Sequence, residues 1–258
     1  ESVGWTAWCE ELLERGRSGA DLGMWAELNK DFYQAFIQEG RWNMYVEGIG
    51  NTLKVAVLAL ILGVVLGLLA AMVRTFHDQR REDGTGAVLS VLNFFCKVYT
   101  TVIRGTPMMV QLLIMAFVIF KSSRNLVGVA ALAFGINSGA YVAEIIRGGL
   151  MSVDSGQMEA GRSLGLNYLQ TMWHIIIPQA VKNILPALGN ELITLLKETS
   201  IVTVIGLRDL TKAAQLVTSK TYGGFMALFG VALVYLAMVM LLSWLMNKLE
   251  RRLRNSER

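Results

Sequence analysis

Long uncharged runs dominate the pattern of hydrophobic and polar positions in this sequence. A run of about 20 apolar residues predicts a membrane-spanning helix, because an α-helix of that length crosses a hydrocarbon core of roughly 30 Å. The candidate segments are residues 55–73, 105–120, 126–143, 184–207 and 222–247. The fourth is interrupted by Glu191, Lys197 and Glu198, and charges at membrane depth normally face a protein interior or a wet cavity. The pattern predicts an all-α, multispanning membrane protein with about five transmembrane helices.

The composition agrees with this class. Hydrophobic residues occupy 53% of the 258 positions and charged residues only 17%, which is too apolar for an ordinary soluble domain. Basic residues on the cytoplasmic side of a membrane explain the formal net charge of +4 more simply than nucleic-acid binding does. His77 and His174 are isolated in the sequence, so we expect no metal site.

The placement of Lys and Arg predicts the orientation in the membrane. Arg74, Arg80 and Arg81 follow the first predicted span, and a basic tail at residues 248–258 follows the last. The first 40 or so residues are acidic on balance. Because cytoplasmic flanks are enriched in Lys and Arg, we expect the N-terminus outside and the C-terminus in the cytoplasm. Cys9 and Cys96 then lie on opposite sides, so we expect no disulfide within the chain.

This orientation divides the chain into three parts. Residues 1–43 form an external or interfacial segment, residues 44–247 form the transmembrane domain, and residues 248–258 form the tail. Within the first part, Trp25, Leu28, Phe32 and Phe36 recur at helical spacing. That spacing predicts an amphipathic helix on the outer membrane face, with docking of a partner as the alternative.

The most informative polar segment is the predicted cytoplasmic loop at residues 148–182. It carries Glu159, Ala160, Gly161, Gly165, Ile175, Ile177 and Pro178. Gly165 suits the end of one short helix and Pro178 punctuates a second segment, so we expect two short helices along the membrane face. The spacing resembles the EAA signature of permease subunits in binding-protein-dependent ABC importers. The usual signature has Ala at position 161 and Leu at position 177.

Further segments resemble the branch of this family that transports polar amino acids of the His/Gln/Arg type. They are residues 104–112, 138–149, 156–159, 185–191 and 195–200. The similarity covers about residues 35–252, and residues before 35 lie outside it. It implies a type I ABC importer permease fold and a location in the bacterial cytoplasmic (inner) membrane.

The resemblance also implies partners. In the family, the helix pair of the cytoplasmic loop fits a groove on an ATPase subunit, so we expect an ATPase dimer here. The expected coupling residues are Glu159, Ala160, Gly161, Gly165, Ile175 and Pro178. Five helices do not easily enclose a path alone, so a second permease chain is expected, either an identical copy or a paralogue. The other expected partners are an extracellular solute-binding protein, an amino-acid substrate and the lipid bilayer, and none is a nucleic acid.

We expect no enzymatic chemistry in this chain. The phosphate-cradling pattern G-x-x-x-x-G-K-[S/T] is absent from the sequence, and the stretch from Gly63 to Gly67 lacks the Lys. ATP and Mg²⁺ are therefore expected on the partner ATPase, with no cofactor and no catalytic residue in this chain.

Polar residues inside the predicted spans are candidates for the substrate path, because a zwitterion in a bilayer must be resolvated by protein groups. The candidates are Asn137, Ser138, Tyr141, Glu144, Glu191, Thr199 and Ser200. Three of them, Asn137, Tyr141 and Glu144, share one helix face. The alternatives are hydrogen bonds between helices and, for Glu144, a structural ion pair with Arg147.

Two other functional classes fit less well. An ion-coupled secondary transporter or channel would need carboxylates at mid-membrane, and Glu191 alone is a thin basis for one. A membrane anchor or sensor with an external binding segment is the third possibility. The sequence favours the importer permease.

Overall fold

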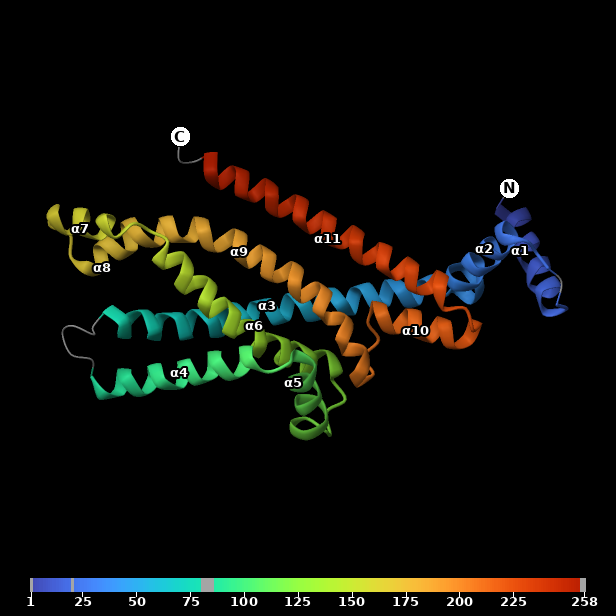
Figure 1. Ribbon diagram of the computed structural model, residues 1–258, viewed down its shortest axis with the longest axis horizontal. Helices are drawn as coiled ribbons and strands as arrows, with labels where there is room; N and C mark the ends of the chain where they lie inside the picture. Colours follow the sequence, from blue (N-terminus) through green and yellow to red (C-terminus); the bar gives the residue numbers. More distant parts are fainter. Residues whose placement is uncertain (1, 20, 80–85, 256–258) are drawn as a thin grey trace. The chain divides into compact units, whose positions relative to one another are not determined.

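The computed structural model describes residues 2–19, 21–79 and 86–255, and every regular element in these ranges is helical (Figure 1). The α-helices are α1 (Ser2–Arg17), α2 (Met24–Phe32), α3 (Trp42–Gln79), α4 (Ala87–Gly105), α5 (Met108–Ile114), α6 (Leu126–Met151), α7 (Ser155–Ser163), α8 (Tyr168–Thr171), α9 (Ile177–Glu198), α10 (Leu210–Thr221) and α11 (Gly224–Asn255). Tyr33–Ile37, Met115–Ile119 and Met172–Ile176 are π-helical, and Gln38–Gly40 and Thr199–Ile205 are 3₁₀-helical. The all-α prediction is confirmed.

The chain divides into two compact units. The first contains the residues up to Leu53 together with Val202–Met238, and the second contains Lys54–Ile201 and the residues from Val239 onward. In the first unit, Leu210, Ala214 and Val217 of α10 are fully buried among residues of α3 and α11. The buried Asp209 caps α10 by accepting from the backbone N–H groups of Thr211 and Lys212, at 3.1 and 2.9 Å. Burial raises the pKa of the Asp209 carboxyl, and these hydrogen bonds oppose the rise.

Four helices in the described part of the chain are long and apolar enough to cross a membrane. They are α3 over Trp42–Asp78, α4 over Ala87–Gly105, α6 over Leu126–Met151 and α11 over Gly224–Leu253. Helices α3 and α6 contain the predicted spans at 55–73 and 126–143, and α11 covers the predicted span at 222–247 except for its first two residues. The predicted span at 105–120 is instead the shorter apolar helix Met108–Ile119, and α4 was not predicted.

The predicted span at 184–207 differs in its bounds. The α-helix α9 begins at Ile177 and ends at Glu198, and the backbone continues as a 3₁₀-helix to Ile205. Its charged residues keep it outside the four apolar candidates. In the second unit, α9 packs along α6, and its half-buried Glu191 accepts a hydrogen bond from Ser138. Arg80 and Arg81, which the orientation prediction used, lie outside the described residues.

Two pairs of glycines bring α3 and α6 into close contact. A Cβ added at Gly63 would lie 2.8 Å from the Ser138 Oγ, and one at Gly67 would lie 2.6 Å from the Val142 Cγ1. The opposing glycines of α6 meet α3 in the same way: a Cβ at Gly135 would lie 2.6 Å from the Leu62 Cδ2, and one at Gly139 would lie 2.9 Å from the Leu66 Cβ. Both pairs have the four-residue spacing that lets transmembrane backbones approach.

Replacing Gly67 with Val should separate α3 from α6, because the added methyl groups have no space. Overpacking typically costs about 1–3 kcal/mol. We therefore expect Gly67→Val to lower the thermal midpoint of the detergent-solubilised protein. Gly50→Val is the matched control on the same helix, since nothing lies within 4 Å of a Cβ there. Equal midpoints for the two variants would contradict the packing.

Candidate functional sites

Two helical elements occupy the predicted cytoplasmic loop, but only α7 is a separate short helix, because α8 is the first turn of a helical segment that continues to Glu198. Helix α7 begins after Asp154, whose carboxylate accepts from the Gly156 N–H at 2.7 Å. Helix α8 begins with a capping box, in which Asn167 and Gln170 exchange side-chain-to-backbone hydrogen bonds of 2.9 Å. Both starts are therefore fixed by local hydrogen bonds.

A glycine turn joins the two helices. Gly165 has a φ of +83°, where an L side chain is strained, and its N–H donates to the Arg162 carbonyl at 3.0 Å. The Leu166 N–H donates to the Gly161 carbonyl at 3.1 Å, which completes a left-handed helix ending. Nothing lies within 4 Å of a Cβ built at Gly165. Position 165 therefore favours glycine because of its backbone conformation, and not because a neighbouring group leaves no space for a side chain.

The close approach lies instead at Gly161, the position where the EAA signature usually has Ala. A Cβ there would lie 2.5 Å from the Cγ2 and 2.8 Å from the Oγ1 of Thr171. The Thr171 side chain is fully buried, and its hydroxyl donates to the Asn167 carbonyl at 3.1 Å. Because Gly161 has no side chain, the Thr171 side chain packs directly against it, and this contact holds α7 against α8.

The outer surface of the helix pair is exposed. Glu159, Ala160 and Pro178 are exposed, whereas Ile175 is half-buried. Around them stand three large hydrophobic side chains, with exposed fractions of 80% at Leu164, 67% at Leu169 and 69% at Trp173. Large exposed apolar side chains are candidates for an interaction surface. Of the predicted coupling residues, Glu159, Ala160, Gly165 and Pro178 are exposed, and Gly161 is buried.

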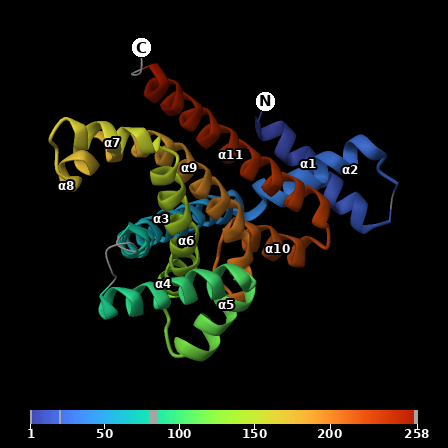
Figure 2. The same cartoon turned by 60° about the vertical axis from the view of Figure 1, so that its left-hand side comes forward.

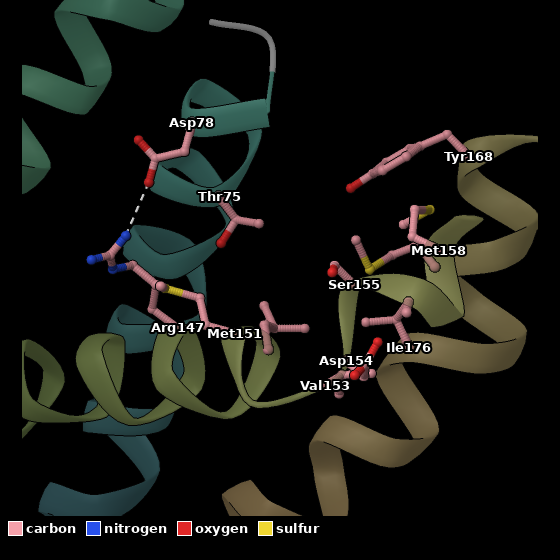
Figure 3. Close-up of a pocket in the computed structure, with 12 residues that line it drawn as sticks. Thr75, Asp78, Arg147, Met151, Val153, Asp154, Ser155, Met158, Tyr168 and Ile176 are labelled. Carbon is pink, nitrogen blue, oxygen red and sulfur yellow. Dashed lines mark hydrogen bonds and ion pairs between the residues drawn. The ribbon is translucent and has the colours of Figure 1, made fainter. Parts of the chain in front are cut away.

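Figures 1 and 2 show α7 and α8 at the same end of the second unit as the end of α3 and the start of α4. A crevice of about 430 Å³ separates the helix pair from the ends of α3 and α6. Figure 3 shows Arg147 and Asp78 on one side of it, joined by a 3.0 Å hydrogen bond, and Tyr168 and Met158 on the other. The Thr75 hydroxyl lies on the same side of the crevice as Arg147 and Asp78.

An ion-pair network surrounds Glu144 on α6. Arg74 of α3 binds its carboxylate, the Arg147 Nε lies 3.7 Å from it, and the Arg104 Nη1 lies 4.0 Å from it. The Arg104 guanidinium also stacks over the Tyr141 ring at 5.3 Å. The sequence singled out Tyr141, Glu144 and Arg147, but it did not assign a role to Arg74 or Arg104 here.

A second polar cluster lies where α6 meets α9 and α5. The Ser138 hydroxyl donates to the Glu191 Oε1 at 2.7 Å, and the Asn137 amide donates to the Gln111 Oε1 at 3.1 Å. Ser138 and Asn137 are buried, and Glu191 is half-buried. Gln111, which the sequence did not single out, is anchored by donating to the Ile103 carbonyl at 2.8 Å. The sequence feature that could have identified Gln111 is its position within residues 104–112, one of the segments that resemble the family.

The remaining two candidates lie at the end of α9. Thr199 is fully buried, and its hydroxyl donates to the Leu196 carbonyl at 2.7 Å. Ser200 follows it in the 3₁₀-helix and is half-buried. Both residues stand where the helix changes type, one to two residues beyond Glu198.

Comparison with known proteins places the sequence in a family of transport proteins. Residues 86–255 match the family described as the inner membrane component of binding-protein-dependent transport systems. The chain is 40% identical to a putative glutamine transport system permease protein GlnP of Rickettsia bellii over 215 residues, which cover 81% of this chain and 92% of the relative. It is 37% identical to the arginine transport system permease protein ArtQ of Bacillus subtilis over 219 residues, covering 82% of this chain and 93% of the relative.

Solved structures show the same relationship. An amino acid ABC transporter crystallised with histidines superimposes with a TM-score of 0.73 at 41% identity, covering 81% of this chain and 94% of that chain. The MetNI methionine ABC transporter, in an inward-facing conformation, shares the fold with a TM-score of 0.67 at 19% identity, covering 84% and 99%. The chain therefore belongs to the family of inner membrane components of binding-protein-dependent transport systems, the permease subunits of ABC importers.

Proposed function

We propose that this chain forms the translocation path for polar amino acids and is driven by a separate ATPase that docks on α7 and α8. The relatives named for glutamine and arginine transport support this substrate class. The complex would contain an ATPase dimer that binds ATP and Mg²⁺, a second permease chain and an extracellular solute-binding protein. Family membership favours this importer over an ion-coupled transporter or a channel.

The observation that carries the coupling proposal is a continuous helical rod. Helix α8, the π-helical turn Met172–Ile176 and α9 follow one another without a break from Tyr168 to Glu198. At about 1.5 Å per residue this rod is roughly 45 Å long. One end belongs to the helix pair, and Glu191 lies near the other. A displacement of the pair by the ATPase would therefore move the Glu191 carboxylate.

We also propose that α9 is the fifth crossing, beside α3, α4, α6 and α11. Its polar residues need not face lipid, because Ser138 of α6 binds Glu191. Five crossings place the two termini on opposite sides. Arg74, Arg147 and Lys182 lie within two turns of the ends of α3, α6 and α9 that adjoin α7, so the positive-inside rule assigns this end to the cytoplasm and the N-terminus to the outside.

The polar cluster on α6 and α9 is the proposed substrate contact. An amino acid at membrane depth needs a partner for its ammonium group and hydrogen-bonding groups for its polar side chain. Glu191 supplies a half-buried carboxylate, and Glu198 lies two turns further along the same face of α9. Asn137 and Gln111 supply amides nearby on α6 and α5.

A single cysteine at Glu159 tests the orientation and the docking together. In a chain lacking Cys9 and Cys96, Glu159→Cys should react with a membrane-impermeant thiol reagent in inside-out vesicles and stay unlabelled in intact cells. Adding the ATPase subunit should shield it, because it would lie in the docking groove. The exposed Ser18→Cys should show the opposite sidedness. Labelling of position 159 from outside would overturn the orientation, and unchanged labelling with the ATPase bound would overturn the docking.

Gly161→Ala should weaken the contact between α7 and α8, because the new methyl group would meet Thr171. We expect reduced ATP-driven uptake with normal membrane insertion, since this contact lies outside the spans. Thr171→Ala in the same chain frees the space and should restore most of the loss, so the two substitutions are strongly non-additive. Uptake measured for both single variants and the double variant checks this. A double variant as impaired as Gly161→Ala would refute the contact.

Glu191→Gln should reduce uptake by about tenfold, because a charge-assisted contact is worth roughly 1.5–3 kcal/mol. The substitution preserves size, so the complex should still assemble and hydrolyse ATP. Thr194→Val on the same helix is the control, since Thr194 is exposed and its hydroxyl only donates to the Asn190 carbonyl. Uptake and ATP hydrolysis are measured in proteoliposomes. Wild-type uptake by Glu191→Gln would assign Glu191 a purely structural role.

A further inference from the structure

The N-terminal helices lie outside the residues that match the family, and they form a hairpin of their own. The Trp5 Nε1 donates to the Asn29 Oδ1 at 3.3 Å, and the Tyr33 hydroxyl donates to the Glu10 Oε1 at 3.0 Å. The Trp5 ring packs edge-on against the Tyr33 ring at 5.9 Å. Cys9 is fully buried between the two helices. These contacts occupy one face of α2 and its continuation.

A second face of α2 is apolar and uncovered. Met24, Trp25, Leu28 and Phe32 have exposed fractions of 79%, 76%, 38% and 44%. Successive helical residues are rotated by about 100°, so these four side chains fall within an arc of roughly 100°. The charged residues of α2 lie on the remaining face, where Glu27 is exposed. The helix thus has one face for α1, one for water and one for an apolar environment.

The hairpin is attached firmly to the start of α3. The Phe36 ring contacts the Tyr45 ring at 5.1 Å, and the Tyr45 hydroxyl donates to the Ala35 carbonyl at 3.3 Å. Between the helices, Glu39 and Gly40 have φ values of +56° and +65°, so the chain breaks its helix where the membrane span begins. The apolar face of α2 therefore has a fixed direction relative to the first turns of α3.

The first turns of that span also expose apolar side chains. Trp42 and Val46 lie one turn apart on α3, with exposed fractions of 54% and 56%. They belong to the membrane span at Trp42–Asp78, so their environment is lipid or its interface. Aromatic residues, Trp above all, favour that boundary, and an amphipathic helix lies in it with its apolar face buried by about 5–10 Å.

We propose that the hairpin of α1 and α2 is an interfacial anchor, whose face of Met24, Trp25, Leu28 and Phe32 is buried in the outer leaflet beside the start of α3. The occupant of this face is the bilayer, because the hairpin is tied to the first turns of a membrane span through Phe36 and Tyr45. Electrostatic attraction to anionic lipid does not hold it there: residues 2–32 contain six carboxylates and three cations. The anchor fixes the depth at which α3 enters the membrane. The assignment to the outer leaflet rests on the proposed orientation, but the burial does not.

Spin-label depth measurements on the full chain test this proposal. Nitroxides are attached at Leu28→Cys or at Glu27→Cys in a chain carrying Cys9→Ala and Cys96→Ala, reconstituted in phosphatidylcholine vesicles. Adjacent positions make a matched pair, since both side chains are exposed but only Leu28 belongs to the apolar face. The ratio of oxygen to nickel-chelate collisions should be several-fold higher at 28 than at 27. It should not fall in 1 M salt, because the contact is apolar.

Equal, water-like ratios at both positions would overturn the anchor. So would shielding of position 28 that appears only when the solute-binding protein is added, since the face would then be a protein-docking surface. A ratio at 28 that depends on anionic lipid would replace the apolar mechanism with an electrostatic one. ATP-driven uptake is measured on the same vesicles. Because the depth of the label is measured without ATP, the anchor proposal and the transport proposal can fail independently of each other.

Discussion

The close contact of α3 with α6 is the constraint on which the transmembrane unit depends. Lipid tails are as apolar as leucine side chains, so helices inside a bilayer gain little from hiding apolar surface and associate through packing and hydrogen bonds. The glycines at 63, 67, 135 and 139 make that packing possible. Once α6 is held there, its other faces meet α4, α5 and α9. The polar groups of the candidate path therefore owe their placement to close packing of α3 against α6 at these glycines.

Two sets of contacts bear on how the pair of α7 and α8 can move relative to this core. One is the helical rod from Tyr168 to Glu198, which links the pair directly to the polar cluster. The other is the set of ion pairs among Asp78, Arg147 and Glu144, which ties the ends of α3 and α6 across the crevice wall. A crevice between the pair and these ends leaves room for relative movement. The pair can thus shift as a body while the span ends stay joined.

Much of this fold could be predicted from the sequence, because long apolar runs and short-range caps are local signals. Helix α4 was missed for a physical reason: its Asn93 and Thr100 are buried, and the Tyr99 hydroxyl donates to the Ile136 carbonyl at 2.6 Å. Polar side chains covered by a neighbouring helix lower the apparent hydrophobicity of a span. The bounds of α9 were misplaced because polar residues occupy its first turns and an apolar 3₁₀ segment follows its end. The motif predicted the helix pair and its glycine turn, but the contact between Gly161 and Thr171 joins positions whose relation only the folded chain reveals.

The order of the helices along the chain has a consequence for biosynthesis. Helix α3 is long and strongly apolar, so it can enter the bilayer as soon as it is made, before any partner helix exists. Helix α9 carries Glu191, whose hydrogen-bond donor is Ser138 on the earlier helix α6. An unpaired carboxylate is costly in lipid. The ribosome therefore makes the strongly apolar α3 first and makes α9 only after α6, the helix that supplies the hydrogen-bond donor for Glu191, has been synthesised.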